Sequence, residues 1–370
     1  MGDLANVSSG GTPNRANPLY WNGNIPWIST TLIDFNYIDK SEEYITEEGL
    51  KNSSAKLFPI GTLLMAMYGQ GKTRGKISIL NIEATTNQAC GAIITNQEIL
   101  NPVFVFQNLS RRYDEIRDLS NQGSQENLSG GIIKGITISF PNLSEQQKIS
   151  SFLTLIDERI HTQNKIIEEL KLLKNTLSKK IFSGQLKFKD ESGNDFPEWR
   201  MKEVGEIFKI TRGNVLAMNL LTNNWSEETP YPVYSSQTKI KGLAGYYNKF
   251  LFENAITWTT DGANAGDVNY RSGKFYCTNV CGVLLNKEGF ANICVSELIN
   301  SVSKNYVSYV GNPKLMNGIM SKIKIEFPSL QEQAKIANFL SSIDTKIDVE
   351  YQFLQELKEQ KKYLLANLFI

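Results

Sequence analysis

Histidine is almost absent from this chain of 370 residues, which contains only His161. Catalytic triads with histidine, His-Glu-x-x-His zinc sites and paired-histidine metal sites are therefore excluded. His161 stands beside charged residues in a helical pattern, so we expect it to face solvent. The formal net charge is only +1. A role in binding nucleic acid would therefore depend on local basic clusters and not on global charge.

Cysteines and long apolar runs are also scarce. The four cysteines, Cys90, Cys277, Cys281 and Cys294, are too few for a disulfide framework and indicate a reducing, cytoplasmic compartment. The Cys277-x-x-x-Cys281 spacing lacks a second pair, so we expect buried thiols in strands and no metal. No apolar run approaches the ~20 residues that span a bilayer. The composition, 41% hydrophobic and 21% charged, indicates a globular protein. Its length suggests roughly two or three domains.

An internal duplication is the strongest pattern in the chain. Residues 141–160 (PNLSEQQKISSFLTLIDERI) and 328–347 (PSLQEQAKIANFLSSIDTKI) are identical at eleven of twenty positions, with a constant offset of 187. Each copy begins with a proline and a good N-cap residue, Asn142 or Ser329, followed by a glutamate three residues later. This capping-box arrangement predicts the start of a helix in each copy.

The apolar residues that follow step by four and three in alternation, which is typical of a coiled coil. The first series is Ile149, Leu153, Ile156, Ile160, Ile167, Leu170, Leu177 and Ile181, and the second is Ile336, Leu340, Ile343, Ile347, Leu354, Leu357, Leu364 and Leu368. Two helices of about forty residues, ~60 Å long, are therefore expected. An ordinary amphipathic core helix is the alternative, but two long seams of equal phase favour pairing.

Four polar residues interrupt these two apolar seams: Gln163, Lys174, Glu350 and Lys361. In a parallel, unshifted pair, Lys174 would face Lys361. In an antiparallel pair whose facing residue numbers add to about 524, Lys174 meets Glu350 and Gln163 meets Lys361. A slip of one heptad would bury unpaired polar groups, at a cost on the order of a few kcal/mol. We therefore predict antiparallel helices in this register.

The stretch AMYGQGKT, from Ala66 to Thr73, fits a relaxed P-loop spelling. A P-loop must open a helix, whereas the residues from Lys76 to Ile82 alternate as in a strand. With an offset of 191, Gly71, Gly75, Cys90 and Gly91 correspond to Gly262, Gly266, Cys281 and Gly282. QGKTRG thus corresponds to DGANAG, which lacks the lysine and the threonine. The shared feature is a tight glycine turn between strands, whose variable residues face a partner.

The segments before the two helices are rich in short β-branched and aromatic runs, punctuated by Gly, Asn and Pro. We expect strands at residues such as 254–260 and 292–295, and short helices near 107–119 and 297–309. Residues 187–198 are predicted to be a linker. The predicted fold class is α+β, with two strand-rich globular domains separated by two long helices in an internal repeat.

This arrangement resembles the DNA specificity (S) subunit of Type I restriction-modification systems over essentially the whole chain. The most specific motifs are the Pro-x-Leu-x-Glu-Gln-x-Lys-Ile helix starts within 141–160 and 328–347. The openings Gly10-Gly11-Thr12-Pro13, Ile25-Pro26-Trp27-Ile28 and Phe196-Pro197-Glu198-Trp199 are also similar to this family. The second unit has a lead-in, including residues 196–199, that the first lacks. This difference is consistent with a trimmed chain or with a natural alternative start.

The resemblance implies four parts: a first target-recognition domain (1–140), a central coiled-coil helix (141–184), a linker with a second target-recognition domain (185–327) and a distal coiled-coil helix (328–370). It implies that each domain recognises one half of a split, asymmetric site in double-stranded DNA. The antiparallel helices, related by a pseudo-twofold axis, would set the spacing and dock two methyltransferase subunits, which restriction subunits join. A non-catalytic, cytoplasmic protein without cofactor or membrane contact is expected.

Side chains that can contact base edges and phosphates gather in the loops of both units. The candidates are Tyr68, Gln70, Lys72, Thr73, Arg74 and Lys76 in the first unit, and Ser235, Ser236, Gln237, Lys239, Lys241, Asn264 and Arg271 in the second. Asp261 and Asn269 supply further polar groups. Any one of these residues is as readily a solvated loop residue, so the prediction concerns the loops.

Enzymatic alternatives have weaker support. Asn17-Pro18-Leu19-Tyr20 and Asn101-Pro102-Val103-Phe104 are similar to the Asn-Pro-Pro-Tyr/Phe motif of amino-methyltransferases, but both lack the second proline. Neither comes with a glycine-rich strand–turn–helix unit for the methyl donor. No compact carboxylate–lysine cluster indicates a nuclease. The serious alternative is a non-catalytic scaffold that joins proteins through its helices without recognising DNA.

Overall fold

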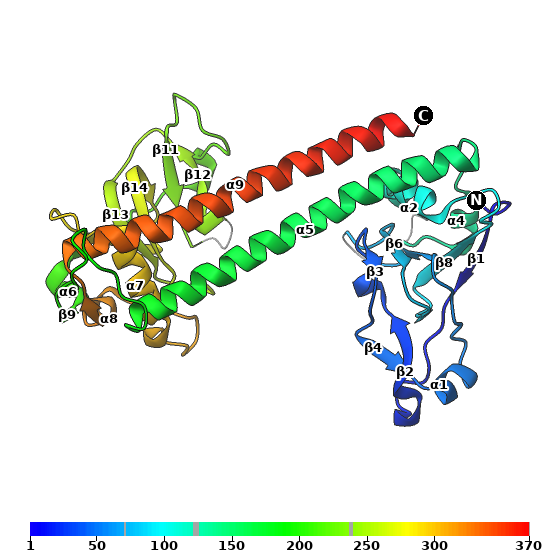
Figure 1. Cartoon of the computed structure of the whole chain (residues 1–370), viewed down its shortest axis with the longest axis horizontal. Coiled ribbons are helices and arrows are strands. Elements are labelled where there is room, and N and C mark those ends of the chain that lie inside the picture. Colours follow the sequence, from blue (N-terminus) through cyan, green and yellow to red (C-terminus); the bar gives the residue numbers. More distant parts are fainter. Residues whose placement is uncertain (70–71, 121–125, 237–239, 370) are drawn as a thin grey trace. The chain divides into compact units, whose positions relative to one another are not determined.

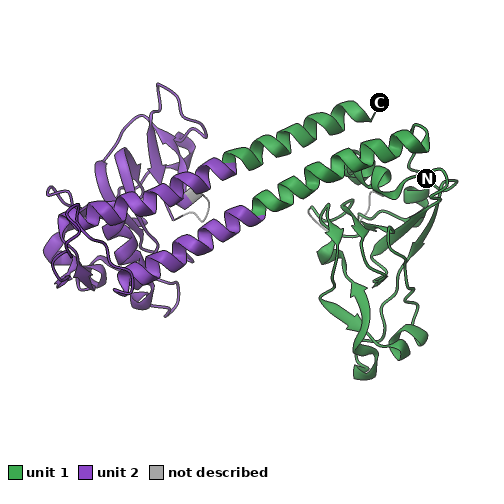
Figure 2. Ribbon diagram, in the orientation of Figure 1, with its two compact units in different colours: residues 1–164, 352–370 green, residues 165–351 purple. Residues whose placement is uncertain are grey.

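The computed structural model describes residues 1–69, 72–120, 126–236 and 240–369. It divides into two compact units, residues 1–164 with 352–370 and residues 165–351 (Figure 2). The two expected long helices are confirmed as α5 (Leu143–Phe182) and α9 (Leu330–Leu368) (Figure 1). Each unit therefore contains a strand-rich domain and one segment of each long helix.

The first unit contains a five-stranded sheet with the order β1-β8-β5-β6-β3. The strands are β1 (Ala5–Ser9), β3 (Tyr37–Ile38), β5 (Leu63–Ala66), β6 (Ile77–Leu80) and β8 (Cys90–Thr95). Neighbouring strands are antiparallel, except that β3 is parallel to β6. Alternate side chains of β5 enter two cores: Leu63 and Met65 pack with Phe104, and Leu64 and Ala66 pack with Ile28. Burial on both faces explains the continuous apolar run of this strand.

A smaller sheet and several short helices complete the first domain. The sheet has the order β4-β2-β7, with β2 (Trp21–Ile28), β4 (Glu43–Ile45) and β7 (Thr85–Thr86). The helices are η1 (Pro18–Tyr20), η2 (Thr30–Leu32), α1 (Glu47–Lys51), α2 (Pro102–Arg111), α3 (Tyr113–Asp118) and α4 (Gly130–Gly135). Helix formation near 107–119 is confirmed, although α2 begins five residues earlier, at the residue after its N-cap Asn101.

The second unit contains a six-stranded sheet with the order β10-β15-β13-β14-β11-β12. The strands are β10 (Lys209–Arg212), β11 (Tyr231–Tyr234), β12 (Leu243–Tyr247), β13 (Phe252–Thr259), β14 (Val268–Cys277) and β15 (Cys281–Leu285). The first five strands of this order have the same directions as the sheet of the first unit, including the parallel β11–β14 pair. The second sheet therefore repeats the first, and β12 extends it.

Further elements surround this sheet. They are β9 (Arg200–Glu203) paired with β16 (Lys324–Phe327), α6 (Val204–Ile207), η3 (Met218–Leu220), η4 (Ile240–Gly242), α7 (Ile293–Ser303), η5 (Lys304–Tyr306) and α8 (Asn317–Ser321). The strand expected at 292–295 is wrong, because the Asn292 side chain accepts a hydrogen bond from the Val295 amide and caps α7. Between α5 and β9, the expected linker contains only turns and a Lys189–Asp195 bridge.

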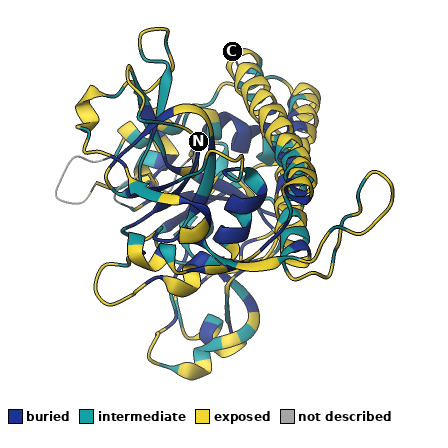
Figure 3. Cartoon of the chain, turned by 90° about the vertical axis from the view of Figure 1, so that its left-hand side faces the viewer, coloured by how far each residue is buried: buried dark blue, intermediate teal, exposed yellow. Residues whose placement is uncertain are grey.

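Both long helices begin as their sequences predict. The Asn142 side chain accepts a hydrogen bond from the Glu145 amide at 3.0 Å, and the Ser329 hydroxyl accepts one from the Glu332 amide at 3.3 Å. The Glu332 carboxylate itself accepts a hydrogen bond from the Trp199 indole at 2.8 Å. Much of the surface of both long helices is exposed, whereas the buried residues lie mainly in the sheets and in the helices that pack on them (Figure 3).

The two long helices are antiparallel within each unit, but the expected register is wrong. In the second unit Lys174 pairs with Asp344 at 2.8 Å, and in the first unit Lys361 pairs with Asp157 at 2.5 Å. The residue numbers of each pair add to 518, six less than the 524 that would place Lys174 against Glu350. The two aspartates lie beside the apolar seams, outside the pattern from which the register was predicted, and supply the carboxylates that pair with the lysines.

Candidate nucleic-acid interface

The predicted glycine turn connects β5 and β6 in the first unit. Gly75 has a φ of 84°, and its amide donates to the Ala66 carbonyl at 2.9 Å. The Ala66 amide in turn donates to the Lys76 carbonyl at 2.9 Å, which closes the turn. Because strand β6 follows, and no helix begins at Thr73, the P-loop alternative is excluded.

An equivalent turn connects β13 and β14 in the second unit. Gly266 has a φ of 87°, and its amide donates to the Thr259 carbonyl at 2.9 Å. The Thr259 amide donates to the Asp267 carbonyl at 3.0 Å, as in the first unit. The turn of the first unit is two residues longer, with 67–74 between the bonded residues against 260–265 here. The prediction of a shared glycine turn is confirmed, although Gly71 lies outside the described residues.

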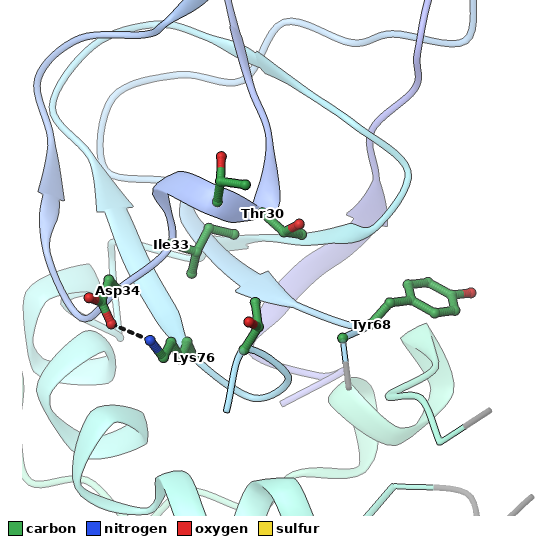
Figure 4. A pocket seen from close by; sticks show the side chains of 8 residues that line it. Thr30, Ile33, Asp34, Tyr68 and Lys76 are labelled. Atoms are coloured by element: carbon green, nitrogen blue, oxygen red, sulfur yellow. Dashed lines mark hydrogen bonds and ion pairs between the residues drawn. The ribbon is translucent and has the colours of Figure 1, made fainter. Parts of the chain in front are cut away.

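A cavity of about 310 Å³, lined mostly by residues with polar or charged groups, lies at the turn of the first unit (Figure 4). Thr30 and Asp34 line it from the segment after β2, and Tyr68, Thr73 and Lys76 line it from the turn. The Lys76 ammonium pairs with the Asp34 carboxylate at 2.5 Å, and Tyr68 projects away from this pair. With 45% of its surface exposed, Tyr68 is available to a partner.

A second polar cavity, of about 300 Å³, lies at the corresponding turn of the second unit. Its most unusual component is Arg271, which is only 7% exposed. The Arg271 Nε donates to the Thr257 hydroxyl at 3.0 Å and an Nη donates to the Lys241 carbonyl at 2.7 Å. The guanidinium carbon lies 3.7 Å from the centre of the Tyr234 ring. Burial lowers the pKa of Arg271, and no carboxylate among the described residues pairs with it.

Most of the predicted DNA-binding residues that the structure describes lie around these two cavities. Tyr68, Thr73 and Lys76 line the first, and Ser235, Lys241 and Arg271 line the second. Asn264 donates to the Ser236 carbonyl at 3.0 Å, so it joins the turn to the neighbouring loop. Lys72 is exposed. Gln70, Gln237 and Lys239 lie outside the described residues.

Arg74 does not lie where the sequence suggested. It is buried, and its guanidinium pairs with the Glu126 carboxylate at 2.5 Å and donates to the Glu126 carbonyl at 3.3 Å. Its place in the turn predicts an exposed cation, but the turn is folded so that this side chain is buried in the protein. Arg74 therefore joins two segments of the first domain and is not a free cation.

The sequence interpretation missed a loop that lies against the glycine turn of the second unit. Ser308 and Lys314 exchange two backbone hydrogen bonds of 2.9 Å, and the Gly262 amide donates to the Pro313 carbonyl at 3.0 Å. The tip carries Tyr309 and Val310, which are 69% and 92% exposed. A helix was expected to reach Tyr309, although the following Gly-Asn-Pro sequence is a turn signal that could have identified this loop.

The cysteines have no reactive or metal-binding arrangement. Burial raises the pKa of Cys90 to about 12 and that of Cys281 to about 11, and it also raises the pKa values of Cys277 and Cys294. Cys294 lies in α7 and not in a strand. Within the described ranges there is no group of three His, Cys, Asp or Glu residues that could hold a metal ion. His161 is exposed, as predicted.

A family model described as the Type I restriction modification DNA specificity domain matches residues 1–172 and 197–359. The chain belongs to this specificity family. The two matched regions together contain both sheets, both glycine turns and most of the two long helices. No helix in the part of the chain that the structure describes has the length and apolar character of a membrane span.

Relatives of the specificity chain include proteins named as specificity subunits, some of them as putative ones. The MjaIX specificity subunit of Methanocaldococcus jannaschii is 27% identical over 266 residues, which is 69% of this chain and 60% of that subunit. A putative specificity subunit of Mycoplasma pneumoniae, S.MpnORF615P, is 31% identical over 63% of this chain and 92% of its own length. The EcoR124I/EcoR124II specificity subunit of Escherichia coli is 32% identical over 42% of this chain and 40% of that subunit.

The fold of the specificity chain is similar to solved structures. The S subunit of a Type I restriction-modification system from M. genitalium has a TM-score of 0.65 at 18% identity and covers all of this chain and 94% of its own. A chain from a structure of a type I R-M system that concerns complex assembly has a TM-score of 0.58 at 15% identity, with coverage of 100% and 96%.

Proposed function

We propose that this specificity chain binds double-stranded DNA without catalysing a reaction, and that each domain recognises one half of a split, asymmetric site. The observation that carries this proposal is the pair of matching sheets with differently lined cavities at equivalent glycine turns. Two domains with one scaffold and different polar surfaces suit the recognition of two different sequences, because function resides in the surface and not in the fold.

The side chains around the turns are of the kinds that contact DNA. Lys72 and Lys241 are exposed cations suited to phosphates. Tyr68 and Thr73 in the first domain, and Asn269 in the second, offer hydrogen-bonding groups suited to base edges. These cations lie close to the two cavities and their polar side chains, which supports local binding despite the net charge of only +1.

The two long helices are proposed to form an antiparallel coiled coil with a pseudo-twofold axis, which sets the spacing between the half-sites. Equivalent ion pairs in the two units support this symmetry. The helices carry exposed apolar side chains such as Leu155 and Leu172, and these suit a docking surface for two methyltransferase subunits, which restriction subunits join. The proposed complex acts in the cytoplasm, and the specificity chain itself needs no cofactor.

Selection from a pool of random DNA duplexes tests this function. The purified chain with its methyltransferase partner should enrich one split sequence with a fixed spacer. Mapping methylated adenines in the source genome should give the same sequence. A scaffold that joins proteins without recognising DNA would enrich no sequence, and that result would reject the proposal.

A further inference from the structure

A cluster of three charged side chains joins the second domain to both long helices. Lys174 of α5 donates to both Asp344 oxygens of α9 at 2.8 Å and to the Glu297 carboxylate of α7 at 2.9 Å. The Lys174 side chain is only 13% exposed. Burial alone would lower the pKa of Lys174, but the two carboxylates raise it above its usual value. The lysine therefore remains charged and joins its own helix, α5, to two other elements, α9 and α7.

The first unit contains a corresponding cluster. Lys361 of α9 pairs with Asp157 of α5 at 2.5 Å, and the other Asp157 oxygen accepts a hydrogen bond from Gln107 of α2 at 2.6 Å. Lys361 and Asp157 each have 20% of their side chain exposed, and Gln107 is fully buried. Here too, one polar cluster joins both long helices to the helix that packs on the sheet.

The two clusters hold equivalent places in the duplicated chain. Lys174 and Lys361 differ by the repeat offset of 187, as do Asp157 and Asp344. Gln107 and Glu297 lie in α2 and α7, the helices that follow β8 and β15 and that both begin after an asparagine cap. The clusters differ in charge, because the second has a carboxylate where the first has a neutral amide.

Partly buried ion pairs contribute little net stability, but they can select the register and orientation of packed helices. Each cluster would be broken by a one-heptad slip of the helices or by a rotation of the domain helix away from them. We propose that Lys174 and Lys361 are positioning residues that fix the orientation of each domain on its helix segments. If the domains are held in one orientation, the spacer between the half-sites has one defined length. This consequence rests on the proposed function.

Replacing the second cluster with neutral side chains tests the proposal. Lys174→Met alone leaves two carboxylates unpaired and should lower the melting temperature of the full chain. The triple variant Lys174→Met, Asp344→Leu and Glu297→Gln removes the charges together and should restore most of that loss. With the methyltransferase partner, the triple variant should discriminate about tenfold less than the wild type against target duplexes whose spacer is one base pair longer or shorter. Its half-site sequences should stay the same.

The control is Lys171→Met, because Lys171 donates to the Tyr351 hydroxyl at 2.5 Å between the same two helices, and neither this bond nor its contact with the Tyr351 ring reaches α7. This variant should keep the spacer discrimination of the wild type. If the triple variant also keeps it, the proposal is wrong. If the wild type enriches no DNA sequence, it is the proposed function that is wrong. The positioning role of Lys174 is then tested by a measurement that does not use DNA.

That measurement uses spin labels on Val310→Cys in the domain and Lys346→Cys in α9, both exposed positions of the second unit. The four native cysteines are buried, so labelling should be confined to the introduced thiols. The distribution of distances between the labels should be at least twice as broad in the triple variant as in the wild type or Lys171→Met. An unchanged distribution would overturn the positioning role, whether or not the chain binds DNA.

Discussion

The two units share the order of five strands, yet they place different side chains at equivalent strand positions. Leu63 pairs with Ile79 in the first sheet, and Ile256 pairs with Tyr270 in the second. The residues that follow Ile79 and Tyr270, which are Leu80 and Arg271, therefore hold equivalent positions. Leu80 is part of an apolar core, whereas Arg271 lines a polar cavity. One strand position therefore holds an apolar core residue in the first sheet and a charged residue at the cavity in the second sheet.

The cavities of the two units also differ in how their charged side chains are paired. In the first unit Lys76 and Asp34 neutralise each other, and an exposed tyrosine stands beside them. In the second unit Asp267 pairs with Lys304 at 2.8 Å, which leaves the Arg271 guanidinium with hydroxyl, carbonyl and aromatic contacts. The polar surface of each domain is therefore distinct, while equivalent backbone hydrogen bonds close the glycine turn beside it.

Exchange of a whole domain should have the largest effect on DNA recognition. Replacing residues 205–327 with the equivalent part of a relative should change only one half of the target. Affinity for the original site should fall toward that of non-specific DNA, a loss on the order of 10³ or more. Sequencing of DNA selected by the hybrid complex would measure this. If both halves of the target change together, the domains do not recognise DNA independently.

Core substitutions should show that the stability of the second sheet depends on a large aromatic side chain, whereas the first sheet has a smaller side chain at the equivalent position. Trp258 is 1% exposed, its indole donates to the Leu315 carbonyl at 3.0 Å, and it lies over Gly282. Trp258→Ala should lower the free energy of unfolding by about 3–5 kcal/mol, because it leaves a cavity. Met65 occupies the equivalent position in β5, and Met65→Ala should cost less, because it removes a smaller side chain and no hydrogen bond. Urea unfolding would compare the two, and equal losses would contradict this difference.

Substitution of Arg271 should sharpen the comparison of the two cavities. Arg271→Lys keeps a cation but loses the planar group that stacks on Tyr234 and donates to two oxygens. If Arg271 contacts a guanine, preference at one position of one half-site should relax by about 1–3 kcal/mol. Selection from a duplex pool randomised in both halves would detect this. If the base preference relaxes in both half-sites, Arg271 affects the structure of the whole chain and does not read one half-site.

Removal of an exposed cation from the first turn should have the smallest effect. Lys72→Ala should weaken binding to all sequences alike and lower the salt slope by roughly one, if Lys72 contacts a phosphate. Titrations at several salt concentrations would measure the slope. Arg74→Ala is the matched comparison, because Arg74 is two residues away but buried against Glu126. It should lower stability and leave the salt slope unchanged.

The parts of the fold that could be predicted from sequence are those fixed by local rules. The N-caps at Asn142 and Ser329 and the glycines at 75 and 266 depend on backbone geometry that few residue types satisfy. Their positions were correct to within a few residues. The duplication added a second, independent instance of each signal, which is why the long helices could be placed with little error.

Features that depend on contacts between distant segments could not be predicted. The helix register was missed because Asp157 and Asp344 lie beside the seam and reach the lysines only when the helices pack. The burial of Arg74 depends on Glu126, which is 52 residues away. Residues 292–295 have a strand-like composition, but the Asn292 cap and packing on the sheet make them helical.

The division of each long helix between the two units has a consequence for synthesis of the chain. Residues 352–369 belong to the first unit, where the Phe369 ring lies 5.0 Å from the Phe104 ring and Leu364 and Leu368 pack against the same core. The ribosome makes these residues only after the entire second unit. Until then the apolar surface around Phe104 and Leu153 lacks this cover, so a nascent or truncated chain exposes apolar side chains that favour aggregation.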